Sequence, residues 1–238
     1  MSRTKPNEYA DNPVEHKLEW VGHEAGGYFT VWDREAKQEI KLELPLRFAY
    51  LDTKKAVGGY YESVKRSFFS NEIRNTKTQE FDVRYYKDGN AHPVAKGLWA
   101  DIKGDIGNKG AKFCNVVYAT LLTSTNEDVP GGSLVKLPLV GAAGSAWIDL
   151  GIKDGESFEV TGYDDRTKGR TKYRSPVFEK IEIDDDEDAI ACDQDKALQE
   201  YFNAKREPKK DTAEDALESG GFVEDGEELT PFDYDVPF

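Results

Sequence analysis

The chain has 238 residues, 38% of them hydrophobic and 33% charged, and its formal net charge is −14. Its 12 Phe, 12 Tyr and 4 Trp supply enough apolar surface for a hydrophobic core, which excludes a wholly disordered chain. No apolar run reaches the roughly 18 residues of a membrane span, and no apolar stretch follows the first residues as in a signal peptide. Two Cys and three His exclude a closed zinc site and a disulfide framework, so we expect a cytoplasmic protein without a cofactor.

The chain begins with polar residues and two prolines, which predict a flexible arm over residues 1–17. From Ile40 to Tyr50 every second residue is apolar or aromatic, and this period of two predicts one half-buried strand in which Pro45 marks an edge or a bulge. The same kinds of signal predict strands at Tyr28–Trp32, Gln79–Tyr86, Val94–Ile102, Lys112–Leu122, Leu134–Leu139, Ser157–Tyr163 and Thr171–Ile183. Residues 18–183 are therefore expected to form a mainly β domain.

Helical patterns are sparse in this part of the chain. Short helices are predicted at Ala142–Leu150 and at Gly59–Asn71, the second with Tyr61 and Phe68 on one side. The glycine-containing segment Lys103–Lys112 lacks the spacing of a phosphate-binding loop and is predicted to be a flexible basic hairpin loop.

The negative charge is confined to the C-terminal part. Residues 1–183 contain 27 basic and 27 acidic residues, whereas residues 184–238 contain 5 and 19. We predict that the acidic run Asp184–Asp188 ends the fold and that an amphipathic helix follows at Asp193–Arg206, so that residues 184–206 are an acidic linker and helix. The sequence leaves open whether this helix packs on its own domain, pairs with another subunit or stays loose. Residues 207–238 have too few apolar groups to fold and are predicted to be a disordered tail.

A basic residue occupies every second position of the segment RTKGRTKYR: Arg166, Lys168, Arg170, Lys172 and Arg174. An extended chain would place all five on one face about 6.7 Å apart, whereas a turn at Gly169 would divide them over two arms of a hairpin. Five like charges without an interleaved acid repel one another, which favours an anionic partner over a merely solvated hairpin. Tyr173 lies within the run and belongs to the same candidate site.

A second basic segment, Lys54–Lys77, has six basic and two acidic residues, with aromatic residues between them. Cations next to flat rings suit a single strand, because unstacked bases lie on the rings while Lys and Arg contact phosphates. The alternative is that the rings belong to the core. Candidate residues in this segment and on the strands after it are Lys54, Lys55, Tyr60, Tyr61, Lys65, Arg66, Arg84, Tyr86, Trp99 and Lys112. Tyr85 and Tyr86 point to opposite faces of one strand, so one packs and the other is available for binding, and the sequence leaves open which.

The chain ends in an acidic, aromatic hexapeptide: Asp233, Tyr234, Asp235, Val236, Pro237 and Phe238. It resembles the C-terminal tip of bacterial single-stranded DNA-binding proteins, which closes in D-[IV]-P-F, with Tyr234 where an acidic residue is usual. The resemblance implies a docking peptide whose terminal Phe enters a basic-rimmed pocket on replication and repair proteins. The alternative is an acidic solubility tail that happens to end in Phe.

The layout of a β domain followed by an acidic, aromatic-ended tail is similar to that of tailed-phage single-stranded DNA-binding proteins. That resemblance implies an elaborated OB-fold, a Greek-key barrel that binds oligonucleotides with the loops after its first and fourth strands. With Ile40–Leu51 as the first strand and Gln79–Tyr86 as the second, the first loop is the basic segment 54–77. With Ala142–Leu150 as the helix before the fourth strand, the second loop is the basic run 166–174, and Tyr28–Trp32 and Leu134–Leu139 are additions.

These features predict a non-enzymatic, sequence-tolerant single-stranded DNA-binding protein of phage DNA replication, recombination and repair, acting in the host cytoplasm. Its tail would compete with DNA and recruit a polymerase, helicase or primase. No membrane partner is expected, the oligomeric state is open, and the preference for DNA over RNA rests on the tail. The alternatives are an acidic decoy, a structural phage protein, and a Mg²⁺-dependent nuclease that uses Asp184–Asp188.

Overall fold

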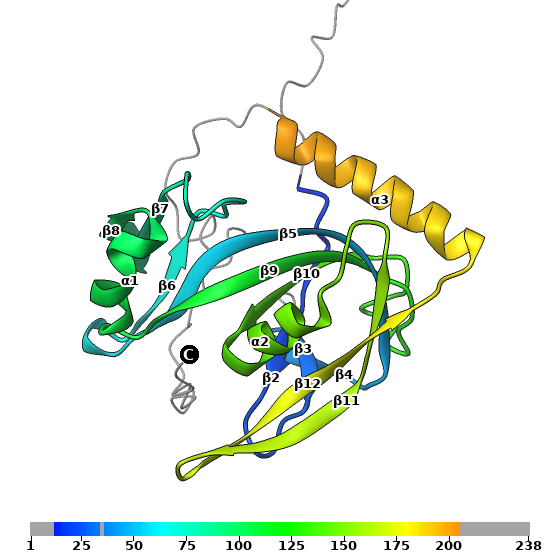
Figure 1. The fold of residues 1–238 in the computed structure, drawn as a ribbon, viewed down its shortest axis with the longest axis horizontal. Helices are drawn as coiled ribbons and strands as arrows, with labels where there is room; N and C mark the ends of the chain where they lie inside the picture. The colour runs from blue at the N-terminus through cyan, green and yellow to red at the C-terminus, as the bar shows by residue number, and fades with distance from the viewer. Residues whose placement is uncertain (1–11, 34–35, 205–238) are drawn as a thin grey trace, which may run out of the picture. The chain divides into compact units, whose positions relative to one another are not determined.

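The computed structural model describes residues 12–33 and 36–204, which divide into two compact units (Figure 1). Among the described residues, unit 1 comprises residues 12–52, 117–138 and 146–204, and unit 2 comprises residues 53–116 and 139–145. The described residues contain twelve strands and three α-helices, so the prediction of a mainly β protein is confirmed. The start of the predicted arm, the predicted tail 207–238 and the terminal hexapeptide lie outside the described residues.

Unit 1 contains two antiparallel arrangements of strands. In the larger, the hydrogen-bonded order is β1-β10-β9-β5, and β11 pairs with the first residues of β5 and with β12. The strands of this sheet are β1 (His16–Lys17), β5 (Leu46–Tyr61), β9 (Ala111–Leu121), β10 (Leu134–Val140), β11 (Ser157–Lys168) and β12 (Thr171–Ile181). The smaller sheet consists of β2 (Glu19–Val21), β3 (Tyr28–Asp33) and β4 (Gln38–Leu42). One pairing departs from the antiparallel pattern, because β1 is parallel to β10.

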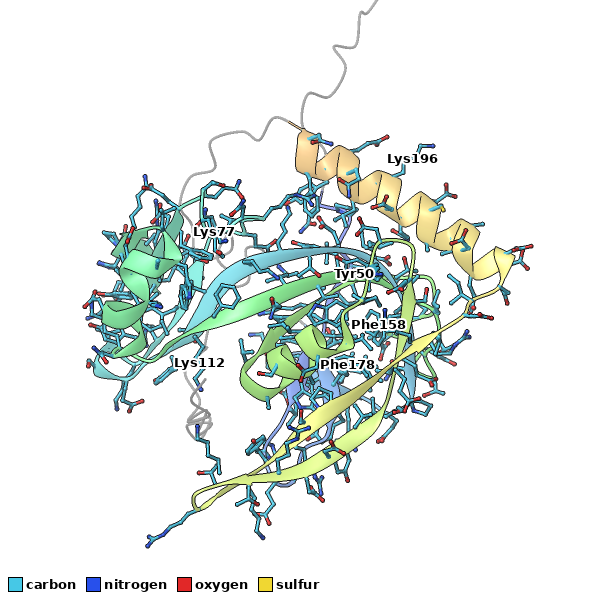
Figure 2. All side chains as sticks on the ribbon, in the orientation of Figure 1. Tyr50, Lys77, Lys112, Phe158, Phe178 and Lys196 are labelled. Atoms are coloured by element: carbon cyan, nitrogen blue, oxygen red, sulfur yellow. The ribbon has the colours of Figure 1, made fainter. Side chains whose placement is uncertain are left out.

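The core of unit 1 is aromatic. The ring of Phe48 on β5 stacks on that of Phe158 on β11 with centroids 5.0 Å apart, and both side chains are fully buried. Trp147 of α2 (Gly141–Leu150) lies edge-on against Phe158 at 5.0 Å and against Phe178 of β12 at 5.8 Å, and Tyr50 packs on it from β5. Figure 2 labels Tyr50, Phe158 and Phe178 of this cluster. Burying each such ring stabilises the fold by about 1.5–3 kcal/mol, so this cluster anchors the base of the β11–β12 hairpin.

Unit 2 is an antiparallel sheet in the order β5-β6-β7-β8 with one helix. Its elements beyond β5 are β6 (Arg66–Ser70), β7 (Phe81–Lys87), β8 (Asn90–Gly97) and α1 (Trp99–Gly107). Phe81, Val83 and Phe68 on one sheet face pack with Ile102 and Ile106 of the helix to form a separate core cluster. Among the described residues, no helix in either unit is long and apolar enough to cross a membrane.

The C-terminal helix α3 (Asp185–Asn203) begins eight residues earlier than predicted. Asp184 and Glu187 form a capping box, in which the Asp184 carboxylate accepts from the Glu187 backbone N–H at 2.8 Å and the Glu187 carboxylate accepts from the Asp184 N–H at 3.2 Å. The acidic run therefore starts a helix instead of ending the fold, because negative side chains stabilise a helix N-terminus.

Helix α3 packs on the rest of unit 1, which is the first of the three arrangements left open by the sequence. Leu198 is fully buried, and the ring of Phe202 lies edge-on to Tyr118 of β9 at 5.2 Å. The Gln194 side chain donates to the Gly132 carbonyl at 3.1 Å.

Three predicted elements differ in the structure. The strand predicted from Ile40 to Leu51 is divided, because β4 ends at Leu42 and β5 begins at Leu46 in the other sheet. The helix predicted at Gly59–Asn71 is instead the end of β5, a 3₁₀ turn at Glu62–Val64 and β6, in which Phe68 and Ser70 are buried with the period of two of a strand. The strand predicted at Val94–Ile102 stops at Gly97. Residues 103–107 of the predicted basic loop belong to α1, whose Ile102 and Ile106 are spaced for one helix face, and the loop ends where β9 begins at Ala111.

The strands between residues 12 and 204 do not close into a barrel. The outer edge of β10 pairs with the short strand β1, and β12 has β11 as its only named partner strand. The predicted second strand, Gln79–Tyr86, corresponds to β7, which pairs with β6 and β8 and not with β5. The predicted strand neighbours were wrong here because β5 continues for 16 residues and takes β6 as its next partner.

Candidate nucleic-acid interface

The basic run 166–174 forms the end of the β11–β12 hairpin (Figure 1). Strand β11 pairs with β5 only through Ser157–Val160, and beyond this point the hairpin continues to a turn between Lys168 and Thr171, with Gly169 at φ 59°. All residues from 163 to 170 are exposed. Of the two geometries left open by the sequence, the hairpin with its turn at Gly169 is therefore present.

The hairpin register divides the five cations between two faces. Arg166 lies opposite Tyr173 and Lys168 opposite Thr171, so Arg166 and Lys168 share a face with Tyr173. Lys172 lies opposite Thr167 and Arg174 opposite Asp165, which places these two cations on the other face. The single row of an extended chain is not present, because across a two-residue turn each even-numbered residue lies opposite an odd-numbered one.

Acidic side chains pair with three of these cations. Glu24 contacts Lys172 at 2.8 Å and raises the pKa of that lysine through this hydrogen bond. Asp164 and Asp165 contact Arg166 and Arg174 at 3.3 Å and 3.1 Å. The sequence argument that unrelieved repulsion demands a partner is therefore weakened, although ion pairs open to water are weak and readily exchange one anion for another.

Arg174 is a structural residue as well as a cation. Its guanidinium donates to the Gly26 carbonyl at 2.6 Å and lies 4.2 Å from the centroid of the Tyr163 ring. Its backbone carbonyl accepts from the indole N–H of Trp20 at 3.0 Å, and its N–H donates to the Gly22 carbonyl at 2.7 Å. The side chain thus joins the hairpin to the segment between β2 and β3.

All the candidate residues outside the hairpin and the terminal hexapeptide lie in unit 2, and several have structural roles there. Lys54 and Lys55 are in the middle of β5 and not in a loop, where Lys54 is buried and the Lys55 ammonium donates to Asn115 Oδ1 at 2.7 Å. Lys65 and Arg66 are exposed at the turn before β6, Tyr60 is half-buried at the end of β5, and Lys112 is partly buried near the start of β9. These residues are not brought into one row.

Two of the candidate aromatic side chains in unit 2 pack against its hydrophobic core. Tyr61 stacks on Phe68 with centroids 5.0 Å apart, and Trp99 contacts Phe81 at 5.9 Å and Phe113 at 5.1 Å. Both are partly buried against the core cluster. These contacts therefore support core packing, and not base stacking, as the role of Tyr61 and Trp99.

The pair Tyr85 and Tyr86 separates as expected. Tyr85 lies edge-on to the core residue Tyr61 at 6.0 Å, whereas Tyr86 is on the other face and stacks on Phe69 at 4.7 Å. Arg84 is on the same face as Tyr86 and binds both carboxylate oxygens of Asp82, at 2.8 Å and 3.0 Å, which lowers the pKa of that carboxyl. Tyr86 therefore forms, with Phe69, a half-buried aromatic pair beside an arginine.

The structure places beside the hairpin one residue that the sequence analysis did not select. His23, in the segment between β2 and β3, pairs with Tyr173 in an antiparallel bridge. Only the cluster of glycines around it, at 22, 26 and 27, marks this segment in the sequence as a close approach of two backbones.

The acidic residues proposed for a metal-dependent nuclease are in the first turn of α3, where Asp184 and Glu187 serve the helix cap. Within residues 12–33 and 36–204, no group of three or more His, Cys, Asp or Glu side chains is arranged to hold a metal ion. No protein-family model matches the chain, and no curated protein or solved structure is significantly similar to it.

Proposed function

We propose that this protein binds single-stranded DNA without strong sequence preference and has no enzymatic activity of its own. The observation that carries the proposal is the end of the β11–β12 hairpin, residues 163–174, which holds five basic and two acidic residues together with two tyrosines and is exposed from residue 163 to residue 170. Side chains of this kind supply both contacts that a single strand offers, since cations bind phosphates and rings stack on bases. Base identity matters little in such contacts, because every base has a π face.

The pairing order in unit 1 supports an open, elaborated OB-fold as the architecture behind this function. β5 pairs with both β9 and β11, β10 follows β9, α2 separates β10 from β11, and β11 forms a hairpin with β12. We take β5, β9, β10, β11 and β12 as the five OB strands, with β9 and not the segment 79–86 in second place. Residues 62–110 then fill the connection after the first strand and residues 169–170 the connection after the fourth, the two loops with which OB-folds bind oligonucleotides.

The role proposed for the acidic C-terminal part rests on its composition and on the resemblance of the last six residues to bacterial tips. Residues 207–238 contain 11 acidic and 2 basic residues, so they are expected to compete with DNA for cationic side chains. Displacement of the tail by DNA would free Asp233–Phe238 to dock on a polymerase, helicase or primase. The layout of a β domain followed by such a tail is similar to that of tailed-phage single-stranded DNA-binding proteins, and a phage origin would place the protein in the host cytoplasm.

Fluorescence anisotropy with labelled single-stranded and duplex oligonucleotides tests the proposal, on the full chain and on a variant ending at residue 206. We expect single strands to bind more tightly than duplex, and binding to weaken with salt by a slope of about −0.7 for each phosphate contacted. Removing the tail should strengthen binding at low salt. If neither the full chain nor the shortened variant binds a single strand at low salt, the proposal is wrong, and tight binding to a host enzyme would then favour the acidic decoy. Cleavage of labelled DNA in Mg²⁺ would contradict the absence of enzymatic activity.

A further inference from the structure

We propose that the two faces of the β11–β12 hairpin have different roles, and that a single strand of nucleic acid lies on the face that carries Arg166, Lys168 and Tyr173, with Tyr173 stacked on a base and His23 beside it. This inference rests on the proposed function and specifies the site within it. It excludes Lys172 and Arg174 from the binding face, although they belong to the same basic run.

The binding face is a row of side chains across three chain segments. Arg166 on β11 is directly opposite Tyr173 on β12, and Tyr173 is in turn paired with His23. Since directly paired residues in antiparallel strands project from the same face, a cation, a phenol ring and an imidazole lie side by side there. The Arg174 N–H, which donates to the Gly22 carbonyl at 2.7 Å, holds the third segment against β12.

Lys168 extends this row toward the hairpin end. It lies two residues from Arg166 on the same strand, so the two cations project in the same direction about 6.7 Å apart. Arg170 follows in the turn itself, where it is exposed. Cations on this face therefore continue past the ring of Tyr173. They can contact the phosphates of a single strand while one of its bases stacks on that ring.

The opposite face is occupied by the protein's own contacts. There, Lys172 is bound to Glu24 at 2.8 Å, and the Arg174 guanidinium lies over the Tyr163 ring and donates to the Gly26 carbonyl. The backbone of the β2–β3 segment lies directly against this ring, because a Cβ built on Gly27 would be 2.5 Å from Tyr163 Cδ1. Arg174 therefore holds the segment in place and is less available to an incoming phosphate, whereas Lys172 is paired with Glu24 at the surface of the same face.

The Arg166–Asp164 contact on the binding face is longer than the Lys172–Glu24 contact on the other face. Asp164 reaches Arg166 at 3.3 Å, and both side chains are more than half exposed. A phosphate can take the place of this carboxylate at little cost, since the pair is open to solvent.

Two pairs of matched variants test the assignment on the full chain, with a labelled oligothymidylate in anisotropy. Lys168→Gln and Lys172→Gln each remove one positive charge from the same hairpin, and Tyr173→Leu and Tyr163→Leu each remove one ring. We expect Tyr173→Leu to weaken binding at least about five-fold, the lower end of the loss of one stacked base. Lys168→Gln should reduce the salt slope by about 0.7, the share of one phosphate. Lys172→Gln and Tyr163→Leu should leave the affinity for the oligonucleotide within about two-fold of that of the unaltered protein, because the loss of a weak, exposed contact has no larger effect.

A second measurement on the unaltered protein avoids any effect of substitution on folding. Acetylation of lysines, mapped by mass spectrometry, should be slowed by oligothymidylate at Lys168 more than at Lys172. Equal protection of both lysines, together with equal losses in both variant pairs, would overturn the division into faces while leaving single-strand binding in place. If the unaltered protein does not bind the oligonucleotide, the proposed function itself has failed.

Discussion

Arg47 and Glu187 form a two-point ion pair, in which Nη1 donates to Oε1 at 2.6 Å and Nη2 donates to Oε2 at 3.1 Å. The contact joins β5 to the first turn of α3 across 140 positions of the chain. Planar, bidentate pairs of this kind are stronger than single contacts, because two parallel hydrogen bonds fix the geometry. This pair is therefore one of the main attachments of α3 to unit 1.

Removing this pair is expected to loosen α3. Arg47→Met should lower the free energy of unfolding by about 1.5–3 kcal/mol, as expected for loss of a partly buried, charge-assisted hydrogen bond. Urea unfolding measures the change. Lys41→Met is the matched control, since the Lys41–Glu43 pair is exposed and its loss should cost less than about 0.5 kcal/mol. Equal unfolding midpoints for the two variants would show that Arg47 does not hold the helix.

The N-cap of α3 gives a prediction that is specific to one side chain. Asp184→Ala should destabilise the protein by about 1 kcal/mol, because it removes the acceptor for the Glu187 N–H. Asp184→Ser should retain most of the stability, since serine is also a good N-cap residue. Thermal unfolding of both variants is the measurement, and a serine variant as unstable as the alanine variant would contradict the cap.

Two adjacent glycines in β5 should respond very differently to the same substitution. Gly59 has φ 113°, and a Cβ there would lie 2.4 Å from the Gly110 carbonyl oxygen, whereas a Cβ on Gly58 meets nothing within 4 Å. Gly59→Ala is therefore expected to cost about 1–3 kcal/mol or more from backbone strain alone, with the clash in addition. Gly58→Ala should be close to neutral or slightly stabilising, because it restricts the unfolded chain.

Chemical unfolding followed by tryptophan fluorescence compares the two, since Trp99 packs in the same unit. If Gly59→Ala unfolds at the same denaturant concentration as Gly58→Ala, the close approach of β5 to the segment before β9 is wrong.

His16 makes stability depend on pH in a defined direction. Burial lowers its pKa below the ordinary value of 6.5, and the nearby Glu15 offsets this only in part. As the pH falls below 6.5, the unfolded chain binds a proton at this position while the folded chain does not, so the His16 contribution makes the folded state less stable toward lower pH. His16→Gln should therefore reduce the loss of stability between pH 7 and the lowered pKa, measured by urea unfolding at a series of pH values. An unchanged pH slope in the variant would contradict the burial effect.

Short-range patterns in the sequence determined much of the secondary structure. The strands at residues 28–33, 111–121 and 134–140 and the helix at 141–150 were predicted from periodicity and bounding residues to within one or two positions. The two misjudged helices also had local signals, namely the Asp184–Glu187 spacing of a capping box and the Ile102–Ile106 spacing of one helix face. Those errors came from interpretation and not from missing information.

The candidate site depended on relationships that no local pattern contains. The alternating cations from Arg166 to Arg174 are evident in the sequence, and so is the confinement of the net negative charge to residues 184–238. The sequence alone did not decide which cations share a face with Tyr173, because a change of one residue in the turn would exchange every face of the hairpin. The pairing of His23 with Tyr173 joins segments 150 positions apart, and the packing of α3 on unit 1 likewise depends on distant contacts. These features were decided by the tertiary structure, because strand register and long-range packing arise only when the whole chain folds.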